Sequence, residues 1–267
     1  MLLKSTIFWQ KTNIIPATEL QLHMERPTTT PIVLLAFLLL WLMPLSSPAQ
    51  VHSLSWEVDG GMVLLGGLTY GISIPLQDKV LPLTEDELGE LDPLLLNRFD
   101  RISTWQDSDF ARLGSDIGLR ASILSPLLLL ADEPSRQEYG TVSIMWLETL
   151  LLTNGITRLV KSTVRRERPY AYNPFTGQEL RVDPETRLSF FSGHTSNAAA
   201  LSFFTAQTFV NNNPGMRRKE LLWASAATLP ALTGFLRVKA GKHFPTDVVV
   251  GYVVGAAIGL IVPNLHK

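Results

Sequence analysis

Long apolar stretches alternate with short polar connections over most of this 267-residue chain. Most of these stretches are too long for β-strands and are rich in Leu, Ala and Gly, which predicts helices. The expected fold is therefore an all-α helical bundle. The stretches that are wholly or nearly free of charge are residues 62–77, 121–131, 139–157, 197–210, 221–236 and 248–262.

The lengths of these stretches bear on whether the bundle lies in a membrane. Most are shorter than the ~20 residues that cross a bilayer core, but polar extensions at their ends can complete a span. We expect a transmembrane bundle, with a soluble all-α protein as the alternative. The expected spans are 113–131, 139–159, 195–211, 220–236 and 247–263, and Gly251, Gly255 and Gly259 allow close helix packing within the bundle.

Charge in the connections suggests an orientation for these spans. Arg217, Arg218 and Lys219, together with Lys267, lie inside the cell if the mature N-terminus is outside, as positive-inside bias requires. The loops 160–194 and 237–246 are then outside. This count holds only if residues 62–77 form a non-spanning or re-entrant helix, because one more span would invert everything after it.

An uncharged run at residues 31–45, PIVLLAFLLLWLMPL, lies near the start of the chain. It follows Arg26 and is followed by Ser-Pro-Ala at 47–49, which has the small-residue form of a secretory cleavage site. Residues 1–49 are therefore predicted to be a signal peptide, with an uncleaved membrane anchor as the alternative. Met24 would give this signal a leader of conventional length.

The rest of the chain divides into two parts. Residues 50–110 form an N-terminal helix and an acidic connecting segment, in which Thr84 and Glu87 have the spacing of a capping box and predict a short amphipathic helix. Residues 111–267 form the helical core.

Composition excludes some functions without identifying one. The 23 Lys and Arg nearly balance the 24 Asp and Glu, so no global positive field indicates a nucleic-acid partner. The chain has no cysteine, which excludes disulfides and thiolate-bound metal. Any anion-binding function must therefore be local.

Three local clusters carry candidate chemistry. In the first, KSTVRRERP, Lys161 precedes Arg168 by seven residues and Pro169 prevents a helix from continuing. Arg168 offers a planar fork to phosphate oxygens, and Lys161 offers a point charge. Taken alone, the cluster is also explained as a solvated basic loop.

The second cluster, Ser192-Gly193-His194, precedes an Ala-rich helical run. A helix N-terminus presents free N–H groups to an anion, and Gly193 permits close backbone approach. His194 at that position can protonate a departing oxygen. Taken alone, this cluster is better explained as an ordinary helix cap.

In the third cluster, Arg237, His243 and Asp247 lie between two apolar runs. If Pro245 opens a helix, the Asp247 carboxylate reaches the imidazole four residues earlier and holds its tautomer. A neutral, oriented imidazole is a competent nucleophile toward phosphorus. An interfacial histidine beside an acid at a helix N-terminus is the alternative explanation.

Coincidence does not explain the three clusters together, because the chance of all three in order is about 3 in 100,000. Lys161-x6-Arg168-Pro169, Ser192-Gly193-His194 and Arg237-x5-His243-x3-Asp247 resemble the three-part signature of the type 2 phosphatidic acid phosphatase superfamily. The resemblance covers about residues 110–264. It implies an all-α core with the three motifs at one end, and no metal or other cofactor.

The resemblance also implies a role for each matching residue. His243 is similar to the nucleophile that becomes phosphorylated, and Asp247 to the residue that orients it. His194 is similar to the acid that protonates the leaving group. The residues expected to bind phosphoryl oxygens are Lys161, Arg168, Ser192, Gly193 and Arg237. Phe191 and Leu236 depart from the pattern, because the family usually has Pro and Ser there.

These expectations describe a metal-independent phosphatase for a phospholipid or polyprenyl phosphate. We expect it in the inner membrane with its site toward the periplasm or cell exterior. A soluble periplasmic acid phosphatase is the first alternative, and a vanadium-dependent haloperoxidase or a non-catalytic membrane scaffold is more remote. The sequence leaves head-group preference and oligomeric state open.

Overall fold

The computed structural model describes residues 51–267, in which every regular element is a helix. The predicted all-α bundle is confirmed for this part of the chain. The predicted signal peptide, 1–49, lies outside the described residues.

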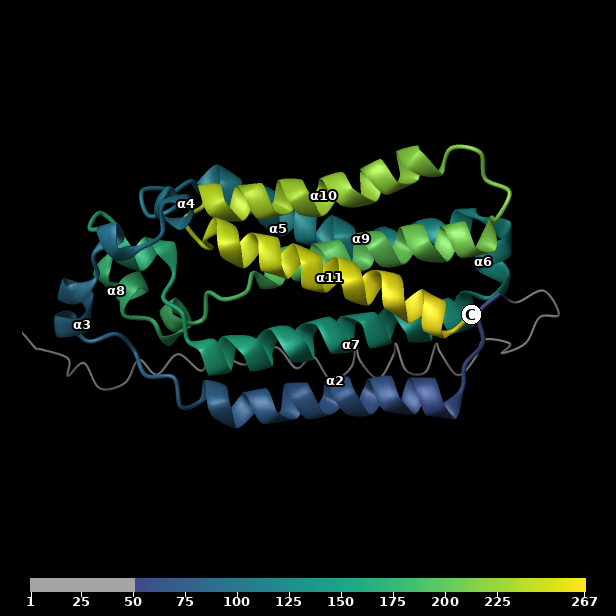
Figure 1. Ribbon diagram of the computed structural model, residues 1–267, viewed down its shortest axis with the longest axis horizontal. Coiled ribbons are helices and arrows are strands. Elements are labelled where there is room, and N and C mark those ends of the chain that lie inside the picture. Colours follow the sequence, from purple (N-terminus) through teal and green to yellow (C-terminus); the bar gives the residue numbers. More distant parts are fainter. Residues whose placement is uncertain (1–50) are drawn as a thin grey trace, which may run out of the picture. The chain divides into compact units, whose positions relative to one another are not determined.

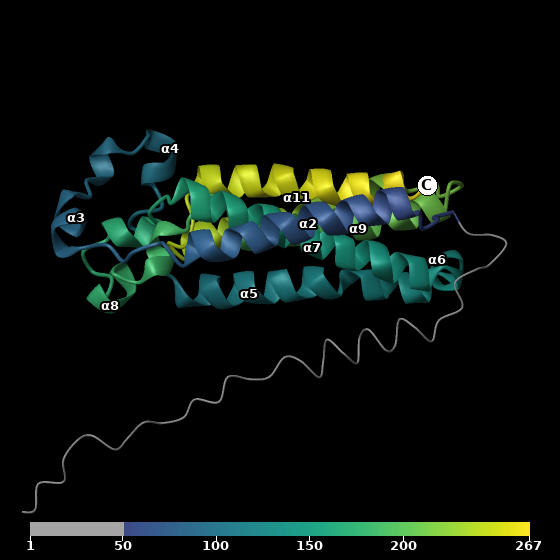
Figure 2. The same cartoon turned by 90° about the horizontal axis from the view of Figure 1, so that it is seen from below.

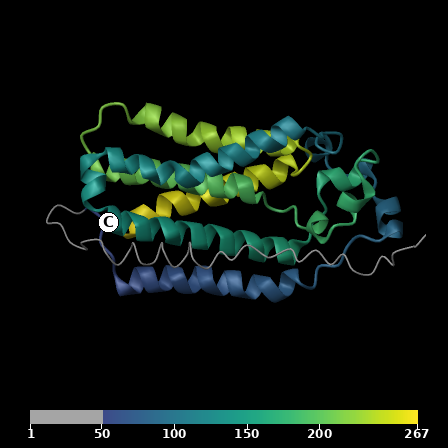
Figure 3. The same cartoon turned by 180° about the vertical axis from the view of Figure 1, so that it is seen from behind.

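Six long helices form the bundle (Figure 1). Each runs in the opposite direction to the one before it, so α2, α7 and α10 point toward one end and α5, α9 and α11 toward the other (Figure 3). Their bounds are α2 Trp56–Gln77, α5 Asp109–Leu124 with its 3-10 extension η2 Ser125–Ala131, α7 Tyr139–Val164, α9 Gly193–Asn212, α10 Lys219–Lys239 and α11 Pro245–Leu265.

Short helices gather at the two ends of the bundle (Figure 2). Within the segment 78–108, Thr84 and Glu87 form the predicted capping box at the start of α3, which spans Glu85–Glu90. At the end where α7 finishes are α3 Glu85–Glu90, η1 Pro93–Leu95, α4 Arg98–Arg101, η3 Pro169–Tyr172, α8 Gln178–Arg181 and η4 Pro184–Arg187, whereas α6 Glu133–Gln137 precedes α7 at the other end.

Helix α9 is the central element, and its residues 198–201 are completely buried. Its closest neighbour is α11, whose glycines face the α9 backbone. A Cβ added at Gly255 would lie 2.0 Å from the carbonyl oxygen of Ser196, and one at Gly259 would lie 2.1 Å from that of Ala200. The predicted close packing at these glycines therefore occurs within the bundle, where no larger side chain fits.

Helix α2 is longer than the apolar stretch 62–77 predicted. It is 22 residues long and runs parallel to α7 over its length, with Gly66 against Leu151 and Gly155 against the backbone of Gly66. The apolar stretch in the sequence starts only at Met62, after the charged residues Glu57 and Asp59. The helix in fact begins at Trp56, where the Ser55 side chain accepts a hydrogen bond from Val58 N.

Much of the outer surface of the bundle is apolar. Helices α5 with η2, α10 and α11 are each long and apolar enough to cross a membrane. Large apolar side chains that are more than half exposed include Leu64 and Leu68 on α2, Phe110 and Ile117 on α5, Leu221 and Phe235 on α10, and Val253 and Ile261 on α11. Such a surface is unfavourable in water and suits a lipid environment.

Candidate active site

The three sequence clusters meet at one end of the bundle. The C-terminal ends of α7 and α10 lie there beside the N-terminal ends of α9 and α11 (Figure 1). Lys161 comes from α7, His194 from α9 and Arg237 from α10. Helix α7 ends at Val164, four residues before Arg168, so Arg168 lies in the following loop.

His243 lies at the centre of this group and is 2% exposed. Its Nε2 is 3.4 Å from Nη1 of Arg168. Because a guanidinium only donates, Nε2 must accept, and the ring proton must be on Nδ1. Within residues 51–267, Nδ1 has no hydrogen-bond partner, and it is 3.6 Å from Oδ2 of Asp247, which is beyond hydrogen-bond length. The imidazole therefore has the tautomer of a nucleophile, with its proton on the side of the carboxylate.

Asp247 is fully buried and held by neighbours other than His243. Helix α11 begins at Pro245, as predicted, and the Asp247 carboxylate accepts hydrogen bonds from Phe244 N at 2.9 Å and Ser189 Oγ at 2.6 Å. Its Oδ1 accepts from Nη1 of Arg166 at 2.6 Å. Asp247 is thus fixed before any substrate is present.

Arg166 joins this carboxylate to a second one. Its Nη2 donates to Oδ2 of Asp100 at 2.7 Å, and its guanidinium lies 4.0 Å from the centre of the Phe244 ring. Asp100 also accepts from Thr246 N and Oγ1. Burial favours a raised pKa for Asp100, but the bonds from Arg166 and Thr246 outweigh it and hold this pKa below its ordinary value.

Backbone carbonyl groups hold the cations of the site in place. Lys161 Nζ donates to the carbonyl oxygens of Leu188 and Ser189. Arg168 donates through Nε to Glu185 O at 2.9 Å and through Nη1 to Lys242 O at 3.2 Å. Arg168 also donates through Nη2 to Oε2 of the exposed Glu185 carboxylate at 3.3 Å, whereas the neutral carbonyl acceptors leave the charge of Lys161 available to an anion.

Arg237 has a donor without a partner. It is 6% exposed, and its Nη1 contacts Ser115 Oγ at 3.4 Å and Asp116 Oδ1 at 3.7 Å. Its Nε has no hydrogen-bond partner among the described residues. A buried, unpaired guanidinium donor is costly, and a bound oxyanion would satisfy it.

The start of α9 combines a helix cap with a position for an anion. The Ser192 side chain accepts from Thr195 N, and the Ser192 amide donates to Asp247 O at 3.0 Å, which ties α9 to α11. Gly193 lies beside Lys161, because a Cβ there would be 3.8 Å from Lys161 Cε. The helix N-terminus thus lies next to a cation.

His194 is 28% exposed, and its Nε2 is 2.8 Å from Oδ1 of Asp116 on α5. Asp116 therefore contacts both His194 and Arg237. The sequence offered no signal for Asp116, which lies in a separate amphipathic helix. Arg166 had a weak signal, since it is two residues before Arg168 in the first cluster.

The charges around His243 determine its protonation. Burial lowers the pKa of His243 most, and the positive charges of Lys161, Arg168 and Arg237 lower it further. Its pKa is therefore well below its ordinary value, and the imidazole is neutral at pH 7.

Comparison with known proteins relates the C-terminal half of the chain to one family. Residues 144–267 match the PAP2 superfamily. Phosphatidylglycerophosphatase B of Bacillus subtilis is 31% identical over 123 residues, which cover 44% of this chain and 57% of that protein. Lipid A 4'-phosphatase of Porphyromonas gingivalis is 27% identical over 147 residues, which cover 54% of this chain and 59% of that protein.

Decaprenylphosphoryl-5-phosphoribose phosphatase of Mycobacterium tuberculosis is 29% identical over 114 residues, covering 43% of this chain and 55% of that protein. The chain thus matches a little over half the length of these curated relatives. The crystal structure of a transmembrane PAP2 type phosphatidylglycerolphosphate phosphatase from Bacillus subtilis is 19% identical, with a TM-score of 0.44, and covers 78% of this chain and 94% of that one.

Proposed function

We propose that this chain, whose residues 144–267 belong to the PAP2 superfamily, is a phosphatase that hydrolyses a phosphate ester or diphosphate of a membrane lipid through a phosphohistidine. One observation carries the proposal. The unprotonated Nε2 of a buried, neutral His243 faces Arg168, in a group of cations that includes a guanidinium nitrogen with no partner.

The reaction would proceed in two displacements at phosphorus. His243 Nε2 attacks the phosphorus atom and the bond to the lipid oxygen breaks, while protonated His194 gives its proton to that oxygen. Neutral His194 then takes a proton from water, whose oxygen attacks phosphorus and breaks the P–N bond. The products are the dephosphorylated lipid and inorganic phosphate, and both histidines return to their starting states.

The remaining residues would stabilise the charge that develops on the phosphoryl oxygens. Lys161, Arg168 and Arg237 supply fixed positive charge, and the Gly193 amide and Ser192 supply neutral donors. Asp247 would stabilise the proton on Nδ1 of His243, with their 3.6 Å separation closing to a hydrogen bond when substrate is bound. No step of this mechanism requires a metal ion or a cofactor.

A lipid substrate is supported by the surroundings of the site. The same helices that supply its residues present apolar side chains outward, so an acyl or prenyl chain can lie against them while the phosphate reaches the cations. The relatives are named as phosphatases of phosphatidylglycerophosphate, lipid A and decaprenylphosphoryl-5-phosphoribose. We propose a phosphatidic acid-like lipid or a polyprenyl diphosphate for this chain.

Phosphate release by the purified full-length chain tests this function. Phosphatidic acid, phosphatidylglycerophosphate and a polyprenyl diphosphate would be assayed with and without EDTA. We expect release from at least one of them in EDTA, no release by His243→Ala, and unchanged release by His52→Ala, which lies at the other end of the bundle. Release that needs added metal, or an active His243→Ala variant, would refute the mechanism.

We also propose that the site faces the periplasm or cell exterior, because the connection between α9 and α10 carries Arg217, Arg218 and Lys219. Since six helices of alternating direction place Val51 and Lys267 at the same end, this orientation puts Val51 inside the cell. A cleaved secretory signal would put Val51 outside. The two predictions exclude each other when all six helices span the membrane.

Cysteine labelling decides between them, because the chain has no native cysteine. Gly177, near the site, and Gly215, between α9 and α10, are both exposed with open space where a side chain would begin. In intact cells a membrane-impermeant maleimide should label Gly177→Cys and leave Gly215→Cys unlabelled. The reverse pattern would refute an exterior site. Extraction by buffer without detergent would refute the membrane location.

A further inference from the structure

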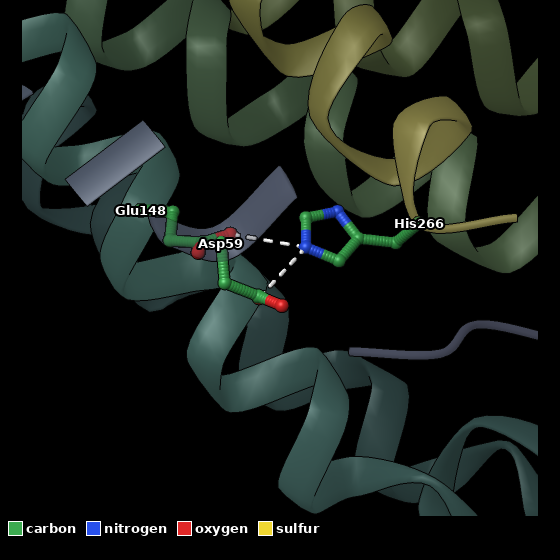
Figure 4. A group of neighbouring side chains, drawn as sticks. All are labelled: Asp59, Glu148 and His266. Carbon is green, nitrogen blue, oxygen red and sulfur yellow. Dashed lines mark hydrogen bonds and ion pairs between the residues drawn. The ribbon is translucent and has the colours of Figure 1, made fainter. Parts of the chain in front are cut away.

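A second group of chemically reactive side chains lies at the end of the bundle away from the candidate active site. Asp59 of α2, Glu148 of α7 and His266, just after α11, point toward one another (Figure 4). His266 Nε2 is 3.1 Å from Asp59 Oδ1 and 3.2 Å from Glu148 Oε2. Both Glu148 and His266 are buried.

The ring of His266 has a defined orientation and tautomer. Its Nδ1 is 2.8 Å from Val262 O, which only accepts, so Nδ1 carries a proton. Nε2 is left facing two carboxylates that offer no donor. A neutral ring therefore directs a lone pair at them, and this arrangement, with Nδ1–H fixed by a carbonyl oxygen, is the one that orients metal-binding histidines.

The carboxylates also have unused oxygens that point into this group. Glu148 is 2% exposed, yet neither of its carboxylate oxygens has a hydrogen-bond partner in the part of the chain that the structure describes. Asp59 uses Oδ2 to accept from Ser55 N at 2.6 Å, which leaves Oδ1 directed at His266. A buried carboxylate without donors is unfavourable unless a cation neutralises it.

A histidine and a glutamate at the same end of the bundle show how this protein satisfies such a pair without a metal. His52 Nδ1 is 2.6 Å from Glu138 Oε1, and His52 Nε2 is 3.1 Å from Nδ2 of the Asn211 side chain. Glu138 Oε2 accepts from the amides of Val51 and His52. Every ring nitrogen and carboxylate oxygen of that pair has a partner, in contrast to Glu148.

We propose that Asp59, Glu148 and His266 bind a divalent transition-metal ion, for which Zn²⁺ is the best fit. An imidazole nitrogen with carboxylate oxygens is a donor set that Zn²⁺ accepts, whereas Mg²⁺ prefers oxygen alone. Ligands about 2.0–2.1 Å from one ion lie about 3.0–3.4 Å apart, which agrees with the two measured distances. One such ion neutralises both carboxylates, and water completes its coordination.

The role of this ion is structural and does not rest on the proposed phosphatase activity. Glu148 precedes Lys161 by thirteen residues on the same helix, which places the two groups about 20 Å apart. The three ligands join α2, α7 and the end of α11, and His266 O also accepts from Ser53 N at 2.7 Å. The ion would thus tie the first and last helices of the described chain to α7.

Metal binding is tested on the purified, detergent-solubilised chain after treatment with a chelator and its removal. Zn²⁺, Mn²⁺ and Mg²⁺ would each be titrated by calorimetry, and thermal unfolding recorded with and without each metal. We expect one Zn²⁺ per chain, weaker Mn²⁺ binding, no Mg²⁺ binding, and a higher Tm with Zn²⁺. Glu148→Gln and Asp59→Asn should each weaken Zn²⁺ binding at least tenfold, and Glu138→Gln should leave it unchanged.

Two outcomes would overturn the proposal. One is the absence of saturable Zn²⁺ binding by the unaltered chain, which would show that an imidazolium held by two carboxylates satisfies the group instead. The other is equal Zn²⁺ affinity in Glu148→Gln, Asp59→Asn and the unaltered chain. Measuring activity separates this proposal from the proposed function. Removal of Zn²⁺ should lower Tm and leave kcat unchanged at temperatures well below Tm. A loss of kcat on Zn²⁺ removal, while the chain stays folded, would contradict the metal-independent mechanism.

Discussion

Arg166 provides a sharp test of how Asp247 is positioned. Its guanidinium makes three hydrogen bonds of 2.6–2.8 Å, to Asp247, Asp100 and Thr246. Arg166→Gln removes the positive charge between the two carboxylates while keeping a polar side chain. We expect lower stability and a slower reaction from this single change.

The expected losses of stability and kcat depend on the hydrogen-bond donors that each carboxylate keeps in the variant. Breaking a buried ion pair by removing one partner costs about 3–5 kcal/mol. Asp247 keeps the donors of Ser189 and Phe244, and Asp100 keeps both donors of Thr246, so a loss of about 3 kcal/mol in stability is expected. A displaced Asp247 no longer aligns the Nδ1 proton of His243, and we expect kcat to fall about 10–100-fold, or about 1.4–2.7 kcal/mol of activation free energy.

The assay pairs this variant with the same change at the preceding residue. Arg165 donates to the carbonyl oxygens of Ser162 and Leu76 and pairs with no carboxylate among the described residues, so Arg165→Gln controls for loss of a loop arginine. Steady-state phosphate release would be measured at a temperature where both variants are folded. A kcat for Arg166→Gln within threefold of that for Arg165→Gln would refute the positioning role, and a raised KM with unchanged kcat would refute it too.

Three further predictions follow from individual contacts. Asp116→Asn weakens the partner of His194 and should lower kcat about tenfold with little change in KM, which steady-state kinetics would show. Gly255→Ala forces a methyl group onto the α9 backbone and should destabilise the chain by about 1–3 kcal/mol in thermal unfolding, whereas Gly67→Ala, which meets no atom within 4 Å, should not. Because the pKa of His243 is lowered by burial and nearby cations, its neutral form persists as pH falls below about 6.5, and the rate of phosphoenzyme formation should not fall as pH is lowered from 7.5 to 5.5. A tenfold loss over that range would indicate an imidazole with an ordinary pKa.

The residues that gather at the site could be found from sequence because each lies at a helix end that the pattern marks. Pro169 begins η3, Ser192 caps α9 and Pro245 begins α11, and Arg168, Gly193, His194, His243 and Asp247 lie within two residues of these markers. Asp100 and Asp116 carry no such mark. They reach the site only because short helix α4 and helix α5 pack there, and nothing in their local sequence specifies that packing.

The group at the opposite end of the bundle could not be predicted from sequence for the same reason, because local sequence does not specify the packing that forms it. Asp59 and Glu148 lie within helices and His266 follows one, at separations of 89 and 118 residues with no repeating spacing between them. A charge near a helix terminus looks like an ordinary solvated residue, and because of Glu57 and Asp59 the predicted start of α2 is six residues too late. Only the tertiary structure shows that Glu148 and His266 are buried, and this burial distinguishes them from ordinary solvated charges.

The packing of α11 on α9 connects the fold to the proposed chemistry. His194 is the second residue of α9 and His243 lies two residues before α11, so the separation of their rings depends on how closely these two helices approach. A Cβ at Gly251 would lie 2.6 Å from Ser192 O, and the Ser192 amide donates to Asp247 O, so the close packing of the two helices extends to the site itself. Because backbone meets backbone there, no side-chain rotamer can absorb a change in distance. A nucleophile and a proton donor for one phosphoryl group need this fixed spacing, which explains why glycine lines the face of α11 that packs on α9.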